Sequence, residues 1–182
     1  MKPRFALLLA FLVATVTLIG APTVSAGPLD NVTCLSGTQS VQYSPGVTAT
    51  PVEQRIDVTT DYQNCVSLSH PSLHHGHFAI STREVQSCLT LARTEEIDFT
   101  ITWYGDDGAV VGHSGVSVTR IVSDVAAGVL VEYVGTVTSG LAGGAPFVEQ
   151  ITYPSLNLTA CLSDGVQNRN SLTNVTKIGL LV

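Results

Sequence analysis

The chain has 182 residues, of which 12% are charged, and its formal net charge at pH 7 is −6. This length suits one domain with one hydrophobic core. An acidic chain without a basic cluster is a poor match for nucleic acid or an anionic membrane surface, because phosphate binding depends largely on lysine and arginine.

The first 26 residues predict a secretory signal peptide. A basic start with Lys2 and Arg4 precedes an uncharged, mostly apolar run over residues 5–20, and small residues precede a cleavage site after Ala26. The apolar run is shorter than the roughly 20 residues of a membrane-spanning helix. We therefore expect a single secreted, extracellular domain over residues 27–182 with no membrane anchor. Cleavage would remove two of the eight basic residues and none of the 14 acidic ones, and the resulting net charge of −8 favours a soluble monomer.

All four cysteines follow the cleavage site, which is typical of structural disulfides in an exported protein. Four cysteines allow three pairings. The pattern of the segment between Cys34 and Cys65 favours a bond between these two, which leaves Cys88 to pair with Cys161. A zinc site is disfavoured because the sequence has no CxxC motif.

The two halves of the segment from Cys34 to Cys65 mirror each other in their alternation of apolar and polar residues, which is the period of half-buried strands. An antiparallel register that places Cys34 opposite Cys65 also aligns two apolar pairs, Val41 with Val58 and Tyr43 with Ile56. The link between the halves contains two prolines and is longer than a tight hairpin turn. The disulfide could therefore fasten a hairpin or cross between two sheets. In a hairpin, strand parity places both cysteines on the polar face.

The rest of the chain predicts further short strands between turn-rich links. The clearest alternation runs from Ile97 to Tyr104 and contains the only tryptophan, Trp103, which we expect in the core. The other expected strands span residues 78–83, 109–121, 129–138, 147–153 and 172–182. No window after the signal peptide has the period of a helix. Eight or nine such strands favour an all-β, antiparallel immunoglobulin-like or Greek-key β-sandwich with two disulfides, and a closed barrel is the alternative.

Four of the five histidines fall between residues 70 and 77. If a strand begins near His75, then His75 and His77 lie on one side of it, as metal-binding histidines on strands often do. His74, His75 and His77 are therefore candidate metal ligands, and His70, His113 or a nearby acid could complete the site. The alternative is a polar loop that changes its charge near pH 6.5.

Residues 112–116 approach the G-x-S-x-G motif of serine hydrolases, but the fifth position is Val116 and strand pattern continues on both sides. Ser114 is therefore better explained by a bulge or turn than by a nucleophile. Asp106 and Asp107 lie side by side, which is typical of a turn. We expect no catalytic residue, no cofactor and no enzymatic activity. Three triplets match the N-glycosylation acceptor pattern and begin at Asn31, Asn157 and Asn174.

Four stretches together resemble a group of small exported actinobacterial proteins of unassigned function: residues 34–46, 101–108, 135–144 and 153–162. The resemblance covers most of the mature chain and implies no catalytic or ligand-binding residues. More distantly, an exported immunoglobulin-like sandwich with two disulfides is similar to the enediyne apoprotein type, which holds a small apolar ligand in a cleft.

These features predict a non-enzymatic extracellular binding or structural module. Its expected partner is an extracellular protein, a glycan or a small ligand. Two alternatives are a small-ligand carrier and a metal-binding protein that uses the loop from His70 to His77.

Overall fold

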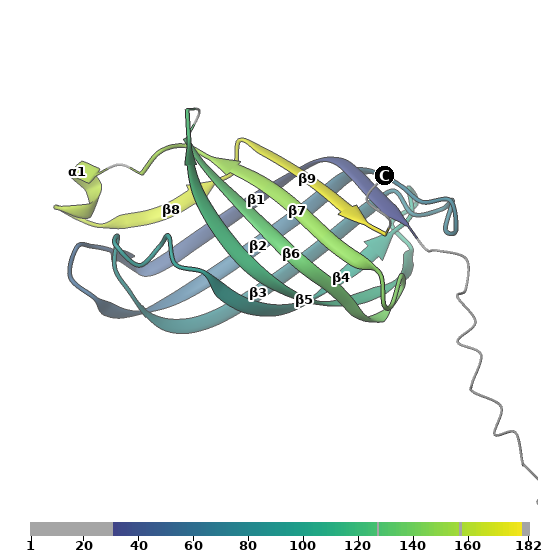
Figure 1. Ribbon diagram of the computed structural model, residues 1–182, viewed down its shortest axis with the longest axis horizontal. Coiled ribbons are helices and arrows are strands. Elements are labelled where there is room, and N and C mark those ends of the chain that lie inside the picture. The colour runs from purple at the N-terminus through teal and green to yellow at the C-terminus, as the bar shows by residue number, and fades with distance from the viewer. Residues whose placement is uncertain (1–30, 127, 157, 180–182) are drawn as a thin grey trace, which may run out of the picture.

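The computed structural model describes residues 31–126, 128–156 and 158–179. The predicted signal peptide and Asn157 lie outside these residues. The described part contains nine strands and one short helix (Figure 1): β1 (Val32–Val47), β2 (Val52–Val66), β3 (His75–Gln86), β4 (Glu95–Tyr104), β5 (Val110–Val125), β6 (Gly128–Gly140), β7 (Pro146–Tyr153), α1 (Leu158–Cys161), β8 (Val166–Asn170) and β9 (Thr173–Ile178).

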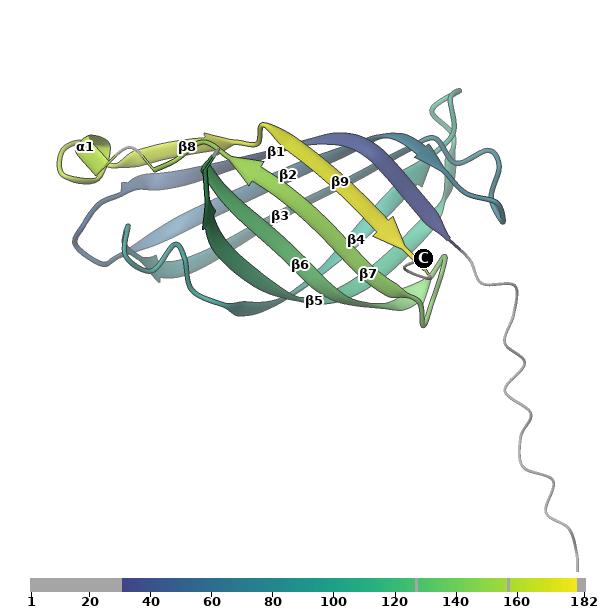
Figure 2. The same ribbon diagram turned by 45° about the horizontal axis from the view of Figure 1, so that its top comes forward.

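The sheet closes on itself. Each strand from β1 to β6 pairs antiparallel with the next, β7 pairs with β9, and β9 pairs with β1. Eight strands therefore form a barrel, whose wall is seen from two directions in Figures 1 and 2. The remaining strand, β8, is not part of this ring. It pairs with residues 40–47 of β1, whereas β9 pairs with residues 32–34 of the same strand.

The expected β-sandwich is therefore wrong, although the all-β antiparallel architecture and the strand count are confirmed. A sandwich leaves free edges on both of its sheets, whereas β9 uses both edges, one for β7 and one for β1. Sandwiches and barrels share alternating strands and short turns. The pairing of β9 with β1, from opposite ends of the described chain, distinguishes the two folds.

The predicted register of β1 and β2 is confirmed. Cys34 lies opposite Cys65 and is bonded to it, and since the two strands are neighbours the disulfide fastens a hairpin. The expected position on the polar face is wrong, because both cysteines are only 1% exposed. Along β2 every second side chain points into the barrel up to Tyr62. Asn64 then has a left-handed backbone (φ 52°), and Cys65 points inward in its place. Asn64 Nδ2 donates to Ser36 Oγ (2.6 Å), in the part of β1 where the alternation shifts as well.

The second predicted disulfide, between Cys88 and Cys161, is also confirmed. It joins the loop of residues 87–94 to α1, a one-turn helix in a stretch where no helix was expected. Backbone hydrogen bonds from Cys88 N to Thr48 O (2.9 Å) and from Ala49 N to Cys161 O (3.0 Å) add the β1–β2 connection to this cluster. Three connections are thus held together at one end of the barrel. Two disulfides fit folding in an oxidising environment.

No helix in the described residues is long and apolar enough to cross a membrane.

Large side chains fill the half of the barrel that carries the β2–β3, β4–β5 and β6–β7 connections. Trp103 is fully buried, as expected, and an added Cβ at Gly76 on β3 would come within 2.4 Å of its ring. The indole donates to Ser114 Oγ (2.8 Å), and that hydroxyl donates to the Leu141 carbonyl (2.7 Å). The same half buries Tyr62, Leu73, Ile101 and Phe147.

Candidate functional site

The other half of the barrel contains a cavity of about 480 Å³. The side chains that line it leave space between them, whereas those around Trp103 are closely packed. Phe78 and Phe99, stacked with ring centroids 4.3 Å apart, lie where the cavity meets the packed half. The other apolar lining residues are Val41, Ile56, Val58, Ile80, Leu91, Ile97, Val122 and Val131.

The barrel wall is split beside this cavity. β3 and β4 pair only through residues 75–77 and 102–104, and the rest of each strand diverges from the other. The lining includes Ser81, Glu96 and Asp98, which are exposed residues on the two sides of the split. The cavity therefore reaches the surface between the two strands. Cys88, two residues beyond the end of β3, is bonded to Cys161, so this end of β3 is attached to α1.

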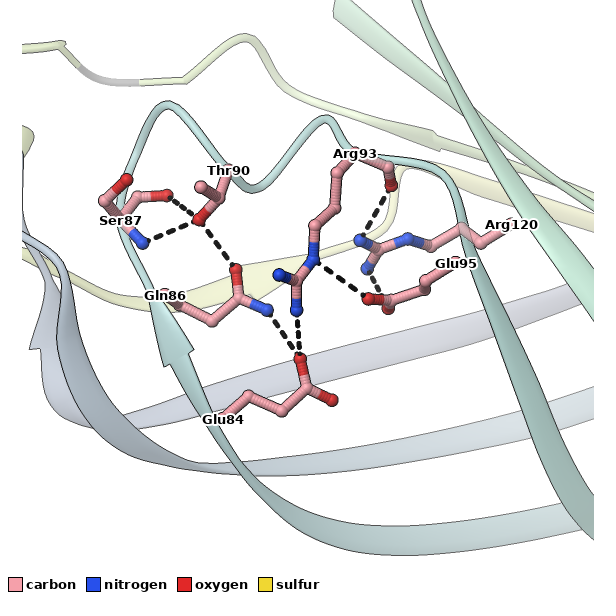
Figure 3. A network of polar contacts seen from close by, with 7 residues as sticks. All are labelled: Glu84, Gln86, Ser87, Thr90, Arg93, Glu95 and Arg120. Carbon is pink, nitrogen blue, oxygen red and sulfur yellow. Dashed lines mark hydrogen bonds and ion pairs between the residues drawn. The ribbon is translucent and has the colours of Figure 1, made fainter.

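An arginine from the β3–β4 loop bridges the split (Figure 3). Arg93 Nη2 lies 2.8 Å from Glu84 Oε2 on β3, and its Nε lies 3.4 Å from Glu95 Oε2 on β4. Arg120 on β5 pairs with Glu95 Oε1 (3.0 Å) and donates from Nη2 to the Arg93 carbonyl (3.2 Å). We call Glu84, Arg93, Glu95 and Arg120 the split network.

The base of the loop is held by a second set of hydrogen bonds (Figure 3). Gln86 Nε2 donates to Glu84 Oε2 (2.7 Å), and Gln86 Oε1 lies 3.1 Å from the Thr90 hydroxyl. The same hydroxyl accepts from the Ser87 backbone N–H (2.8 Å). The loop therefore has a defined position over the cavity, without being part of the sheet.

Inward-facing polar residues form a row across the barrel wall where the cavity meets the packed half. Glu95 lies opposite Arg120, Arg120 opposite Tyr133 on β6, and Tyr133 opposite Glu149 on β7. The next inward positions toward the packed half on β4, β5 and β7 are apolar: Ile97, Val118 and Phe147. On the other side of the row the next inward positions, Val122, Val131 and Ile151, are apolar as well, so the row is a polar layer between two apolar ones.

Glu149 is fully buried at the inner end of this row, outside the cavity lining. Its Oε1 accepts a hydrogen bond from Asn174 Nδ2 (2.8 Å) and its Oε2 accepts one from the Tyr62 hydroxyl (3.0 Å). Burial raises the pKa of Glu149 to about 7, and these two hydrogen bonds limit the rise. The sequence analysis did not identify this residue, although Glu149 alternates with the apolar residues Phe147 and Ile151 on the same face of the predicted strand.

Three tyrosines and Arg169 form another part of the cavity wall. The Tyr153 hydroxyl donates to Gln39 Oε1, and Gln39 Nε2 donates to Thr60 Oγ1 (2.8 Å). The Arg169 guanidinium lies over the Tyr153 ring, 4.5 Å from its centroid. Burial raises the pKa of each of the three tyrosines, Tyr43, Tyr133 and Tyr153, so each keeps its proton at neutral pH and can donate it to a hydrogen bond.

The candidate metal ligands lie on the outside of the barrel, away from the cavity lining. β3 begins at His75, as the strand argument required. His74 Nε2 and His75 Nε2 lie 3.5 and 3.6 Å from the two carboxylate oxygens of Asp106, whereas His77 Nδ1 lies 2.8 Å from Asp61 Oδ1. In the described chain no three His, Cys, Asp or Glu residues gather as a metal site.

Ser114 is fully buried, and its hydroxyl is engaged by Trp103 and the Leu141 carbonyl. Its neighbour His113 lies 3.1 Å from Thr102 Oγ1 through Nδ1. The turn expected at the adjacent aspartates is confirmed, since Asp107 Oδ1 accepts from the Ala109 backbone N–H (3.0 Å). None of these groups lines the cavity.

Fold and site together define a class: an eight-stranded antiparallel barrel with two disulfides and an internal cavity that opens through its wall. Comparison of the chain with protein-family models, curated proteins and solved structures finds no match.

Proposed function

We propose that this protein is a secreted binding protein that holds one small, largely apolar molecule in the cavity of its barrel. The observation that carries the proposal is the cavity itself. Its volume of about 480 Å³ falls within the roughly 300–1,000 Å³ of small-molecule sites. Eight-stranded barrels are also at the size where the interior is either filled by side chains or holds one small ligand.

The lining supports the same proposal. Small-molecule sites are mostly apolar with a few fixed polar groups, and here aliphatic residues and a stacked phenylalanine pair meet a wall of tyrosine and arginine side chains. The split between β3 and β4 offers a path for entry, bridged by Arg93. Export is supported by the predicted signal peptide over residues 1–26 and by the two disulfides.

The proposal is tested with N-phenyl-1-naphthylamine, an uncharged dye that becomes fluorescent in apolar surroundings. Val131→Phe places a ring in the cavity, because Val131 on β6 lines it and is 4% exposed. Val134→Phe is the matched control, since Val134 lies on the same strand and is 43% exposed. We expect one dye molecule per wild-type chain, at least about tenfold weaker binding to the first variant, and unchanged binding to the second.

Thermal unfolding of both variants checks that they are folded. Absence of saturable dye binding to the wild-type protein would refute the proposal. Equal binding by folded Val131→Phe and wild-type protein would place the dye elsewhere and refute the cavity as its site.

A further inference from the structure

Arg169 lines the cavity and forms no ion pair among the described residues. It lies on β8 opposite Val41 of β1, and its guanidinium lies over the Tyr153 ring. Its Nη2 is buried and has no hydrogen-bond partner within residues 31–126, 128–156 and 158–179. Arginine stays charged in proteins, and a buried N–H donor without an acceptor is costly.

The carboxylates around the cavity do not supply that partner. Glu84 pairs with Arg93, and Glu95 pairs with both Arg93 and Arg120. Among the described residues, no Asp or Glu forms an ion pair with Arg169. The split network therefore balances its own charges. The two other lining carboxylates, Glu96 and Asp98, are exposed at the split, so Arg169 keeps a positive charge on the wall that no carboxylate pairs with.

The surroundings of Arg169 are fixed in place. The Tyr153 ring beneath it is held by Gln39, and Gln39 is held in turn by Thr60. Tyr43 lies close enough for hydrogen bonding with Arg169 and carries a phenol proton at neutral pH, because burial raises its pKa more than the arginine lowers it. A guanidinium on an aromatic face with a phenol beside it is a preorganised donor set.

We propose that Arg169 binds the carboxylate of an amphipathic carboxylic acid whose hydrocarbon part fills the apolar region around Phe78 and Phe99. This inference rests on the proposed function and names its ligand class. A planar guanidinium matches a planar carboxylate through two parallel hydrogen bonds. One unmatched positive charge balances one carboxylate, whereas a phosphate dianion would require more positive charge than the split network leaves free.

The test compares two probes of equal chain length, dodecanoic acid and 1-dodecanol, as competitors of the bound dye at pH 7.5. We expect wild-type protein to prefer the acid by at least about tenfold. Arg169→Gln should shift that preference toward the alcohol by about tenfold to a hundredfold, the range for a hydrogen bond to a charged group; the preference is the ratio of the two competitor affinities measured on the same variant, so a changed dye affinity cancels from it. Arg83→Gln is the control, since Arg83 is an exposed arginine on the outside of β3 (74%).

The outcomes separate the two proposals. Without dye binding to wild-type protein, the proposed function and this inference both fail. With dye binding but equal displacement by acid and alcohol, the cavity remains a binding site and only the role of Arg169 is overturned. An acid preference that survives in Arg169→Gln, or that is lost in Arg83→Gln, overturns it as well.

A measurement on the wild-type protein alone covers the case in which Arg169→Gln does not fold. Dodecanoic acid labelled with ¹³C at its carboxyl carbon reports its own ionisation by NMR. A carboxylate paired with an arginine should ionise at a lower pH when bound than when free. A bound acid that ionises at the same pH as the free acid, or at a higher one, overturns the proposal.

Discussion

Replacement of Glu149 by glutamine should flatten the dependence of stability on pH. Glu149 is fully buried on β7, and both carboxylate oxygens accept hydrogen bonds, from Asn174 and from Tyr62. Burial raises its pKa from 4.5 to about 7. In the unfolded chain the same group regains its ordinary pKa, so folding and protonation are linked.

The sign of the effect follows from the two pKa values. Below pH 4.5 the carboxyl is protonated in both states, and folding costs nothing for its charge. Between pH 4.5 and about 7 the unfolded chain releases the proton while the folded chain keeps it. The free energy of unfolding therefore falls by about 1.4 kcal/mol per pH unit. Above pH 7 both states are ionised, and the loss remains constant at about 3 kcal/mol.

Glutamine has the shape of the protonated acid and no charge at any pH. Its amide oxygen can accept from Asn174, and its amide nitrogen can donate to the Tyr62 hydroxyl. Urea unfolding with the disulfides intact, at intervals from pH 4.5 to pH 8, measures the difference between wild-type protein and Glu149→Gln. We expect equal stability at pH 4.5 and a variant that is more stable by up to about 3 kcal/mol at pH 8.

Glu53→Gln is the control, since Glu53 on β2 is 67% exposed and its removal should leave the pH dependence as in the wild type. Two results would refute the reasoning about the buried charge. One is a Glu149→Gln profile parallel to that of wild-type protein. The other is a variant that is less stable than wild-type protein at pH 8.

Two further predictions concern packing and access. Gly76→Ala should lower the free energy of unfolding, measured in urea, by about 1–3 kcal/mol, because its Cβ would lie 2.4 Å from the Trp103 ring. Gly143→Ala, in the exposed β6–β7 turn, is the control. Equal effects of the two substitutions would contradict close packing at Gly76. Arg93→Ala should speed both dye entry and dye release in stopped-flow experiments by about two- to thirtyfold, since each of its two partly exposed ion pairs is worth about 0.2–1 kcal/mol. Rates that match those of Arg83→Ala would show that the split network does not control access.

Local pairing could be predicted from the sequence because it depends on alternation within one segment. The register of β1 with β2 follows from the mirror around their link, and it correctly aligns Cys34 with Cys65. The direction of the cysteines could not be predicted, because it depends on the left-handed backbone of Asn64. An asparagine tolerates that conformation, but nothing in the alternation requires it there.

The barrel and its cavity depend on contacts between distant segments. Closure requires β9 to pair with both β7 and β1, and the polar stretch that contains Arg169 resembles an ordinary loop in the sequence. Only its position beside β1 turns that side chain toward the cavity. Glu149 differs from Arg169, because the sequence already places its charge on the same strand face as the apolar residues Phe147 and Ile151. Its significance depends on that strand being buried, which the barrel determines.

The two halves of the barrel differ in what stabilises them, and this difference explains the position of the Cys88–Cys161 disulfide. The packed half, around Trp103, gains its stability from buried aromatic and aliphatic side chains. The half with the cavity lacks that filling and has a split wall, so it depends more on covalent restraint. Cys88–Cys161 supplies it by tying the β3–β4 loop to α1 beside the β1–β2 connection. A bond of this kind typically contributes about 2–4 kcal/mol. The same bond attaches the chain just beyond β3 to α1, at the end of the split through which the proposed ligand would enter.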